Sequence, residues 1–182
     1  MKPVPFADAT PDATPDAPLD APLDARDALY LRRAIELSAR AADRGNRPFG
    51  AVVVANDGAV LGEAWNDTAE TGDCTGHAEV NALRIASPAH PREAFAGATM
   101  YASGEPCVMC AGAIFWAGLR RVVFGLDAVR LRAFRQLQPG AGDLEMSCRD
   151  VFAASPNAFQ VIGPALADEA TAPHTTYWKT SR

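Results

Sequence analysis

The chain lacks the features of membrane and exported proteins. No apolar run approaches the roughly 18 residues that a membrane-spanning helix needs, and the N-terminus does not have the basic-then-apolar order of a signal peptide. Cysteine is scarce, at four residues in 182, and fits a reducing compartment that keeps thiols reduced. We therefore expect a cytoplasmic protein that does not bind a membrane, with a Cys74–Cys148 disulfide as the less favoured alternative.

An excess of basic residues, which is typical of nucleic-acid binders, is also lacking. The net charge is −5, and five aspartates and one lysine give residues 1–25 a charge of −4. The rest of the chain therefore carries only −1. A near-neutral body argues weakly against a nucleic-acid partner, because a local basic patch can hide in a neutral total.

Aromatic residues are absent from a four-residue repeat that covers residues 8–27 and reads DATP DATP DAPL DAPL DARD. Proline recurs in it through Pro22, which excludes a regular helix. Such a segment buries too little apolar surface to offset its ordering entropy. We expect residues 1–25 to form a disordered acidic tail, with a docking peptide as the alternative, and residues 26–182 to form one domain.

Hydrophobic periodicity and turn signals predict alternating helices and strands in that domain. The turn signal Asn56-Asp57-Gly58 lies between two strands and predicts a hairpin. Residues 126–158 are the least readable, with short helices possible on either side of a loop. The predicted strands cover 50–55, 59–65, 98–102, 121–125 and 159–162, and the helices cover 26–44, 76–86, 107–117 and 164–170. This order predicts a layered α/β domain with a mixed sheet.

Three side chains that suit zinc lie at the predicted starts of two helices. They are His77, Cys107 and Cys110, and a site with three protein ligands leaves the fourth position open for water, as catalytic zinc sites do. Zinc lowers the pKa of such a water to about 7. Glu79, two residues after His77, is placed to move that water's proton. Helix N-termini favour the thiolates that such a site needs.

Other chemistry is compatible with parts of this pattern. A lone C-x-x-C is also found in redox pairs and in structural zinc sites. A structural site needs a fourth ligand, for which Cys74 has a plausible spacing from His77. The chain would then be a zinc-stabilised binding protein without turnover, and Glu79 would have no role.

The cytidine deaminase-like zinc deaminase superfamily carries a paired signature that this chain resembles at His77-Ala78-Glu79 and Glu105-Pro106-Cys107-Val108-Met109-Cys110. The likeness runs from about residue 46 to 125 and is weaker beyond. The resemblance implies a three-layer α/β/α fold around a five-stranded mixed sheet, and an oligomer that is usually a dimer. It also implies one zinc ion per subunit, held by His77, Cys107 and Cys110, with Glu79 as the proton shuttle.

The same resemblance implies a pocket for the base. The segment 48–52, with Phe49 and Ala51, looks like the family segment that lines it, and Ala78 and Glu105 belong to the signature motifs. Asn66 matches the asparagine that hydrogen-bonds the substrate in purine-type members. From the residues alone, Phe49 could equally be core, and Asn66 could cap its own turn.

Two subfamilies resemble the chain, and they predict different substrates. Guanine deaminases match at residues 48–51 and 112–117, and tRNA adenosine deaminases match at 106–113 and 121–125. The C-terminus lacks the basic helix of the tRNA enzymes and resembles the small-molecule branch. The resemblance therefore favours a purine or related aminoheterocycle as substrate, guanine first, giving xanthine and ammonia. Adenosine-to-inosine deamination in tRNA is the alternative.

In the small-molecule branch an aromatic C-terminus closes over the ring, so His174, Tyr177 and Trp178 are lid candidates, with docking onto the core as the alternative. Asp127 is a candidate second acid or base, with a helix N-cap as the alternative. Two residues depart from both subfamilies. Cys74 stands where proline is usual, and Gly104 replaces a larger residue. A wider pocket next to the metal site is the expected result.

Overall fold

The computed structural model describes residues 23–135 and 144–180. Most of the predicted tail of residues 1–25 and the centre of the loop predicted at 139–142 lie outside these residues. No described helix is long and apolar enough to cross a membrane.

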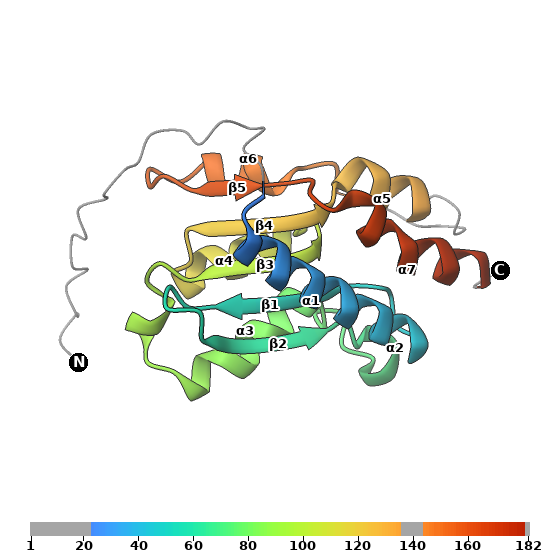
Figure 1. The fold of residues 1–182 in the computed structure, drawn as a ribbon, viewed down its shortest axis with the longest axis horizontal. Coiled ribbons are helices and arrows are strands. Elements are labelled where there is room, and N and C mark those ends of the chain that lie inside the picture. The colour runs from blue at the N-terminus through green and yellow to red at the C-terminus, as the bar shows by residue number, and fades with distance from the viewer. Residues whose placement is uncertain (1–22, 136–143, 181–182) are drawn as a thin grey trace.

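The described residues form a five-stranded mixed sheet between two layers of helices, which confirms the predicted three-layer α/β/α class (Figure 1). The strand order is β2-β1-β3-β4-β5, in which β1 runs antiparallel to β2 and β3, and β4 runs parallel to β3 and β5. The strands are β1 (Gly50–Val54), β2 (Val60–Trp65), β3 (Thr99–Gly104), β4 (Arg121–Leu126) and β5 (Gln160–Ile162).

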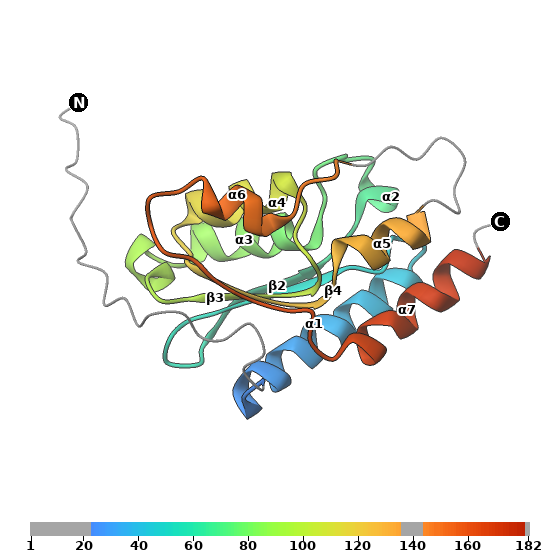
Figure 2. The same cartoon turned by 90° about the horizontal axis from the view of Figure 1, so that it is seen from above.

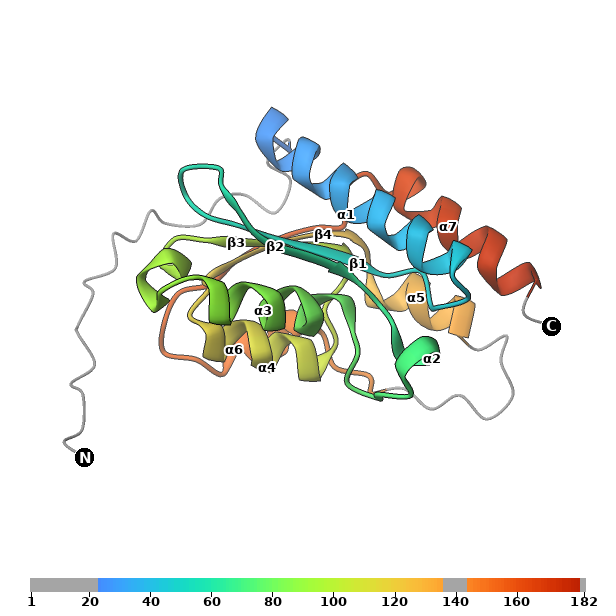
Figure 3. The same ribbon diagram turned by 90° about the horizontal axis from the view of Figure 1, so that it is seen from below.

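Two helices cover one face of the sheet and three cover the other. Figures 2 and 3 show α1 and α7 on one side and α3, α4 and α6 on the opposite side, with α5 at the end of the sheet near α7. The helices are α1 (Ala25–Asp43), α2 (Thr68–Thr71), α3 (Ala78–Ala89), η1 (Arg92–Phe95, a 3-10 helix), α4 (Val108–Ala117), α5 (Ala128–Arg135), α6 (Cys148–Ala153) and α7 (Ala167–Thr180).

Helix α1 begins where its sequence provides a cap. The side chain of Asp24 accepts a hydrogen bond from the backbone N–H of Asp27 at 2.7 Å, which satisfies one of the free donors of the first turn. Apolar residues on one side of the helix then pack on the sheet, among them Leu31, Ala34, Ile35 and Leu37. The sheet is therefore buried on both faces, and all five residues of β1 are buried, as in a central strand of an α/β fold.

Two of the predicted helices, α3 and α7, have different bounds in the structure. Helix α3 continues through Pro88 to Ala89, whereas the prediction ended it at Ser87-Pro88. The last helix begins at Ala167 and not at Pro164. The segment before it lies alongside β4, because Ala165 N–H donates a hydrogen bond to the Phe124 carbonyl. It also continues past Pro173 to Thr180, because residues four apart along it (Ala170, His174 and Trp178) are buried against the core.

Candidate active site and metal centre

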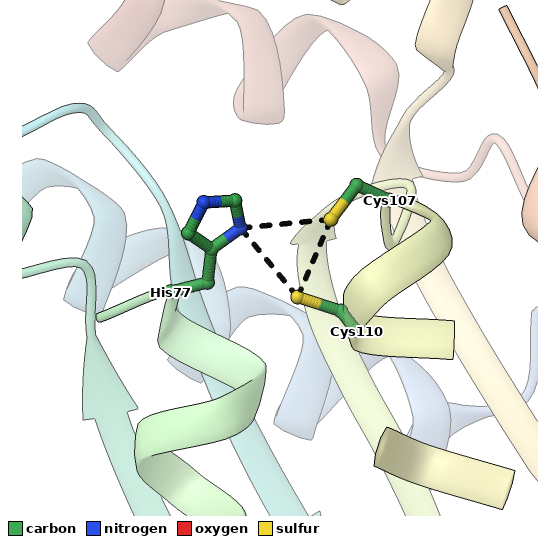
Figure 4. A group of neighbouring side chains, drawn as sticks. All are labelled: His77, Cys107 and Cys110. Carbon is green, nitrogen blue, oxygen red and sulfur yellow. Dashed lines mark hydrogen bonds between the residues drawn. The ribbon is translucent and has the colours of Figure 1, made fainter. Parts of the chain in front are cut away.

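The starts of α3 and α4 lie side by side on the same face of the sheet. His77 is the N-cap residue of α3 and Cys107 is the N-cap residue of α4, and both have extended backbones. Cys110 follows one turn later in α4 and is buried. Because each side chain is set at a helix start next to the central strands, three residues from distant parts of the sequence converge, as Figure 4 shows.

The three ligand atoms form a nearly equilateral triangle. His77 Nδ1 lies 3.6 Å from Cys107 Sγ and 3.5 Å from Cys110 Sγ, and the two sulfurs are 3.6 Å apart. Tetrahedral zinc, with Zn–S of about 2.3 Å and Zn–N of about 2.0 Å, places its ligand atoms roughly 3.5–3.8 Å apart. The geometry of the donor set therefore fits zinc.

Cys74 does not join this group. The cluster of metal-ligating side chains found among the described residues consists of His77, Cys107 and Cys110, and Cys74 is exposed. The described residues therefore do not form the structural zinc site in which Cys74 is the fourth ligand. The alternative Cys74–Cys148 disulfide is also wrong, because both cysteines are free and Cys148 is buried.

Glu79 projects from the first turn of α3 toward the same group. Its Oε2 lies 3.5 Å from Cys110 Sγ, and the residue is only 5% exposed. Burial raises the pKa of the Glu79 carboxyl to about 7, and the negative charge of Cys107 adds to the rise. Contact with Cys110 and His77 lowers the pKa of the Cys107 thiol to about 4. The carboxyl thus lies beside the metal ligands without belonging to them.

A pocket of about 410 Å³, open to solvent, lies in front of this group. His77, Glu79 and Cys107 form its metal side. The remaining lining residues are Arg47, Phe49, Asn66, Glu105, Leu131 and Arg135. The pocket thus joins a candidate metal site to side chains that can hold a ligand.

The sequence profile described as "Cytidine and deoxycytidylate deaminase zinc-binding region" matches residues 24–126. The chain belongs to this family. It is therefore a zinc-dependent hydrolytic deaminase, as the sequence predicted, and the His/Cys/Cys group is able to bind one zinc ion.

Relatives of this deaminase differ in substrate. A probable cytosine deaminase of Schizosaccharomyces pombe is 38% identical over 157 residues, which cover 86% of this chain and 95% of the relative. A guanine deaminase of Bacillus subtilis is 38% identical over 99 residues, 54% of this chain and 66% of the relative. A structure from a study of A-to-I editing by tRNA:A34 deaminases has a TM-score of 0.63 and 30% identity, and covers 80% of this chain and 99% of the other. These relatives thus share the deaminase family and differ in the substrate that their names give.

Asn66 follows β2 and is fixed by its own turn. Its Oδ1 accepts hydrogen bonds from Thr68 Oγ1 at 2.9 Å and from Thr68 N at 3.4 Å. Since a backbone N–H can only donate, the amide oxygen must face Thr68, and this assigns the NH₂ group to the other side. Both readings of the sequence are thus compatible: Asn66 caps its turn and also lines the pocket.

Two residues expected near the base do not line the pocket. Ala51 and Ala78 are fully buried in the core between the sheet and the α3/α4 layer, and neither lines the pocket. Sequence motifs identify them as neighbours of the site, but the alternation of β1 and the packing of α3 direct their methyl groups into the core. Phe49 does line the pocket, and it also packs against the hydrophobic cores on both faces of the sheet.

The aromatic C-terminus lies behind the pocket wall, not over its mouth. His174 is fully buried, its ring is 5.1 Å from the Phe49 ring in an edge-on arrangement, and its Nδ1 accepts from Trp178 Nε1 at 3.2 Å. Tyr177 packs edge-on against Trp178. None of the three lines the pocket. Within this chain the aromatic C-terminus docks onto the core, as the alternative describes, and a lid over the base stays a prediction.

Glu105 lines the pocket but has its carboxylate fully engaged within the protein. One oxygen accepts from Ala128 N at 2.8 Å, and the other accepts from Ser147 Oγ at 2.5 Å and Cys148 N at 3.1 Å. Glu105, which was expected to bind substrate, thus connects the starts of α5 and α6 to the segment between β3 and Cys107.

Asp127 is the N-cap residue of α5. Its Oδ1 accepts a hydrogen bond from Arg130 N at 2.8 Å, as the N-cap alternative predicted.

Three residues that line the pocket were not predicted from the sequence. Arg47 lies just before β1, and Leu131 and Arg135 come from α5, within the stretch that was least readable. The apolar and basic pattern of α5 could have indicated a helix, but nothing in it indicates which helix reaches a pocket.

Proposed function

We propose that this enzyme deaminates a free nucleobase, with guanine as the first candidate substrate and xanthine and ammonia as products. The observation that carries the proposal is that one pocket is lined by Glu79, Phe49 and Asn66 together with two residues of the His/Cys/Cys group. A flat ring between Phe49 and Asn66 would present an edge to Glu79. The reaction replaces the exocyclic amino group with an oxygen from water and releases ammonia.

His77, Cys107 and Cys110 would hold the zinc ion, which when bound supplies Lewis-acid activation of water at neutral pH. Glu79 would take one proton from the attacking water and pass it to a ring nitrogen next to the amino-bearing carbon. It would then take the remaining proton from the added hydroxyl and pass it to the departing amine, which leaves as ammonia. Its burial would keep bulk water from competing for the carboxyl, and its position beside Cys110 Sγ would let it reach a water at the metal site.

Asn66 supports a defined orientation for the base. With its amide oxygen engaged by Thr68, the remaining NH₂ group is a pure donor, so it suits a ring nitrogen or carbonyl oxygen that accepts. Phe49 offers an apolar surface for the ring plane. Guanine presents a carbonyl oxygen and acceptor ring nitrogens, and the smaller base cytosine presents a carbonyl oxygen and one acceptor ring nitrogen.

Cytosine is the second candidate, because the Schizosaccharomyces pombe relative matches over 95% of its own length. Transfer RNA is the alternative that the tRNA:A34 relative raises. The near-neutral charge of residues 26–182 favours a free base over RNA.

We also propose a homodimer in the cytoplasm. Trp116 of α4 is 76% exposed, and Met109 on the same helix is partly exposed. Large exposed apolar side chains on one element are typical of interaction surfaces. Size-exclusion chromatography with light scattering should give twice the chain mass, and Trp116→Glu should give one chain mass.

Ammonia release from the zinc-loaded protein tests the substrate. Guanine, cytosine, guanosine, adenine and ammeline are supplied separately, and inosine is measured in a tRNA anticodon stem. Ammonia from guanine together with xanthine supports the proposal. Turnover of cytosine alone would make cytosine the substrate, and inosine in RNA with no reaction elsewhere would overturn the free-base proposal.

The Glu79→Ala variant separates an enzyme from a zinc-stabilised binding protein. An enzyme loses turnover and keeps zinc. If the variant and the wild type bind bases equally and neither releases ammonia, the proposed free-base substrate is wrong.

A further inference from the structure

Gly104 is the last residue of β3 and comes immediately before Glu105. Its position in the sheet puts it on the same side as Met100 and Ala102, which belong to the core beneath the metal site. The sequence suggested that the missing side chain widens the pocket. In the structure, two neighbouring side chains occupy that space.

A methyl group on residue 104 would lie 3.0 Å from Leu131 Cδ1 and 3.1 Å from Phe49 Cε1. Carbon atoms at their best separation are about 3.5–4.0 Å apart, so both neighbours would have to move. Leu131 and Phe49 both line the pocket. Residue 104 therefore acts on the pocket through these two side chains.

Phe49 has a rigid group behind it. Its ring meets His174 edge-on at 5.1 Å, and His174 stacks on Phe134 at 5.5 Å. His174 is fully buried and is fixed by the hydrogen bond from Trp178. Well-packed interiors do not yield to an added methyl without cost. A displaced Phe49 ring would therefore move toward the pocket, where space remains.

We propose that Gly104 sets the width of the base pocket. Without a side chain at this position, Phe49 and Leu131 rest against the end of β3 and leave room for a bicyclic ring. A larger residue would push both into the pocket and restrict it to a monocyclic base. Gly104 is thus a positioning residue for specificity, and this inference rests on the proposed function, in which the pocket binds a nucleobase.

The test is the Gly104→Ala variant. In the zinc-loaded Glu79→Ala background, which holds substrate without turnover, calorimetry gives the Kd of guanine and of cytosine. Guanine affinity should fall by roughly 10-fold or more, the range that one methylene is worth in a shaped pocket, and cytosine affinity should change by less than about 2-fold. In the active enzyme, KM for guanine should rise while kcat stays within about 2-fold.

Gly112→Ala is the matched control, because a methyl group there meets nothing within 4 Å. It should leave both affinities unchanged. Gly104→Ala with Leu131→Ala should recover part of the guanine affinity, since the second change removes the close contact with Leu131 and leaves the one with Phe49. A crystal structure of Gly104→Ala should show Phe49 and Leu131 shifted into the pocket.

Equal losses for guanine and cytosine, or side chains that stay in place in the Gly104→Ala crystal structure, would overturn the inference. Failure of the wild type to bind or deaminate any base is a different result. It would refute the proposed function, and the crystal structure would still decide whether residue 104 controls the pocket wall.

Discussion

Two clusters of buried ionisable groups lie on opposite faces of the same sheet. On the α1 face, the carboxylate of Asp27 accepts from Tyr101 Oη at 2.8 Å and from two nitrogens of Arg121 at 2.8 and 2.6 Å. On the α3/α4 face, Glu79 lies among metal-ligating side chains. Both carboxyls are almost completely buried.

The two carboxyls respond to burial in opposite ways. Burial alone would raise the pKa of Asp27, but the hydrogen bonds from Arg121 and Tyr101 outweigh it and lower the pKa below its usual value. The pKa of Glu79 rises to about 7, because burial dominates and Cys107 adds a negative charge. A buried acid whose charge is balanced within the chain serves the fold, whereas one whose charge is not balanced is a candidate for function.

Removal of a metal ligand should have the largest effect on the functional cluster. Cys107→Ala leaves two protein ligands, so we expect zinc content, measured by plasma emission spectrometry, to fall from one per chain to near zero and deamination to reach background. The loss of affinity should exceed the roughly 10–100-fold that changing a supporting contact costs. Cys74→Ala is the control and should keep both zinc and activity, since Cys74 is outside the ligand group.

Glu79→Gln should separate proton transfer from metal binding. The amide has the same shape but cannot accept the proton, so kcat should fall by about 10²–10⁴-fold. Zinc content should remain at one per chain, because Glu79 is not among the three ligands. Thermal stability should not fall, since a neutral amide replaces a buried acid. Loss of zinc in this variant would show that Glu79 is a ligand.

Asp27→Asn should show the reverse pattern, a loss of stability with activity retained. It leaves Arg121 without its buried counter-charge, and we expect about 3 kcal/mol lower free energy of unfolding in urea. The kcat/KM of the folded variant should stay within about 2-fold of wild type. The double variant Asp27→Asn with Arg121→Met should recover stability. A loss of activity equal to that of Glu79→Gln would show that the Asp27 cluster serves function as well as the fold.

The sequence could predict the metal group because a known signature pairs the His77 segment with the Cys107–Cys110 segment. His77 and the Cys107–Cys110 pair stand at helix starts, and spacing along a helix fixes which side chains share a face. The same local signals predict the strands and the hairpin at Asn56-Asp57-Gly58. The five-stranded sheet then follows from the resemblance, and the structure confirms it.

The pocket walls could not be predicted because they depend on packing between distant elements. Leu131 lines the pocket only because Glu105 and Asp127 hold the start of α5 in place. His174 supports Phe49 from behind only because α7 continues past Pro173, which local propensity disfavours. In both cases tertiary contacts override the local signal.

His174 adds a third buried group, and its effect on stability should be the smallest and should depend on pH. Burial lowers the pKa of its imidazole to about 4, and the positive charge of Arg135 lowers it further. The unfolded chain binds a proton near pH 6.5 and the folded chain does not until about pH 4. The stabilisation is thus complete above pH 6.5 and is lost as the pH falls, at up to about 1.4 kcal/mol per pH unit.

Urea unfolding at pH 7 and pH 5.5 measures this effect as the difference between wild type and His174→Gln, in which the amide can still accept from Trp178. Wild type should lose about 1 kcal/mol more than the variant between these two pH values, because other titrating groups contribute equally to both proteins. Asp27 does not titrate in this range, since the hydrogen bonds from Arg121 and Tyr101 hold its pKa below the usual value of an aspartate. Parallel losses in the two proteins would mean that His174 is protonated in the fold, and that burial on this face does not exclude charge without a counter-ion.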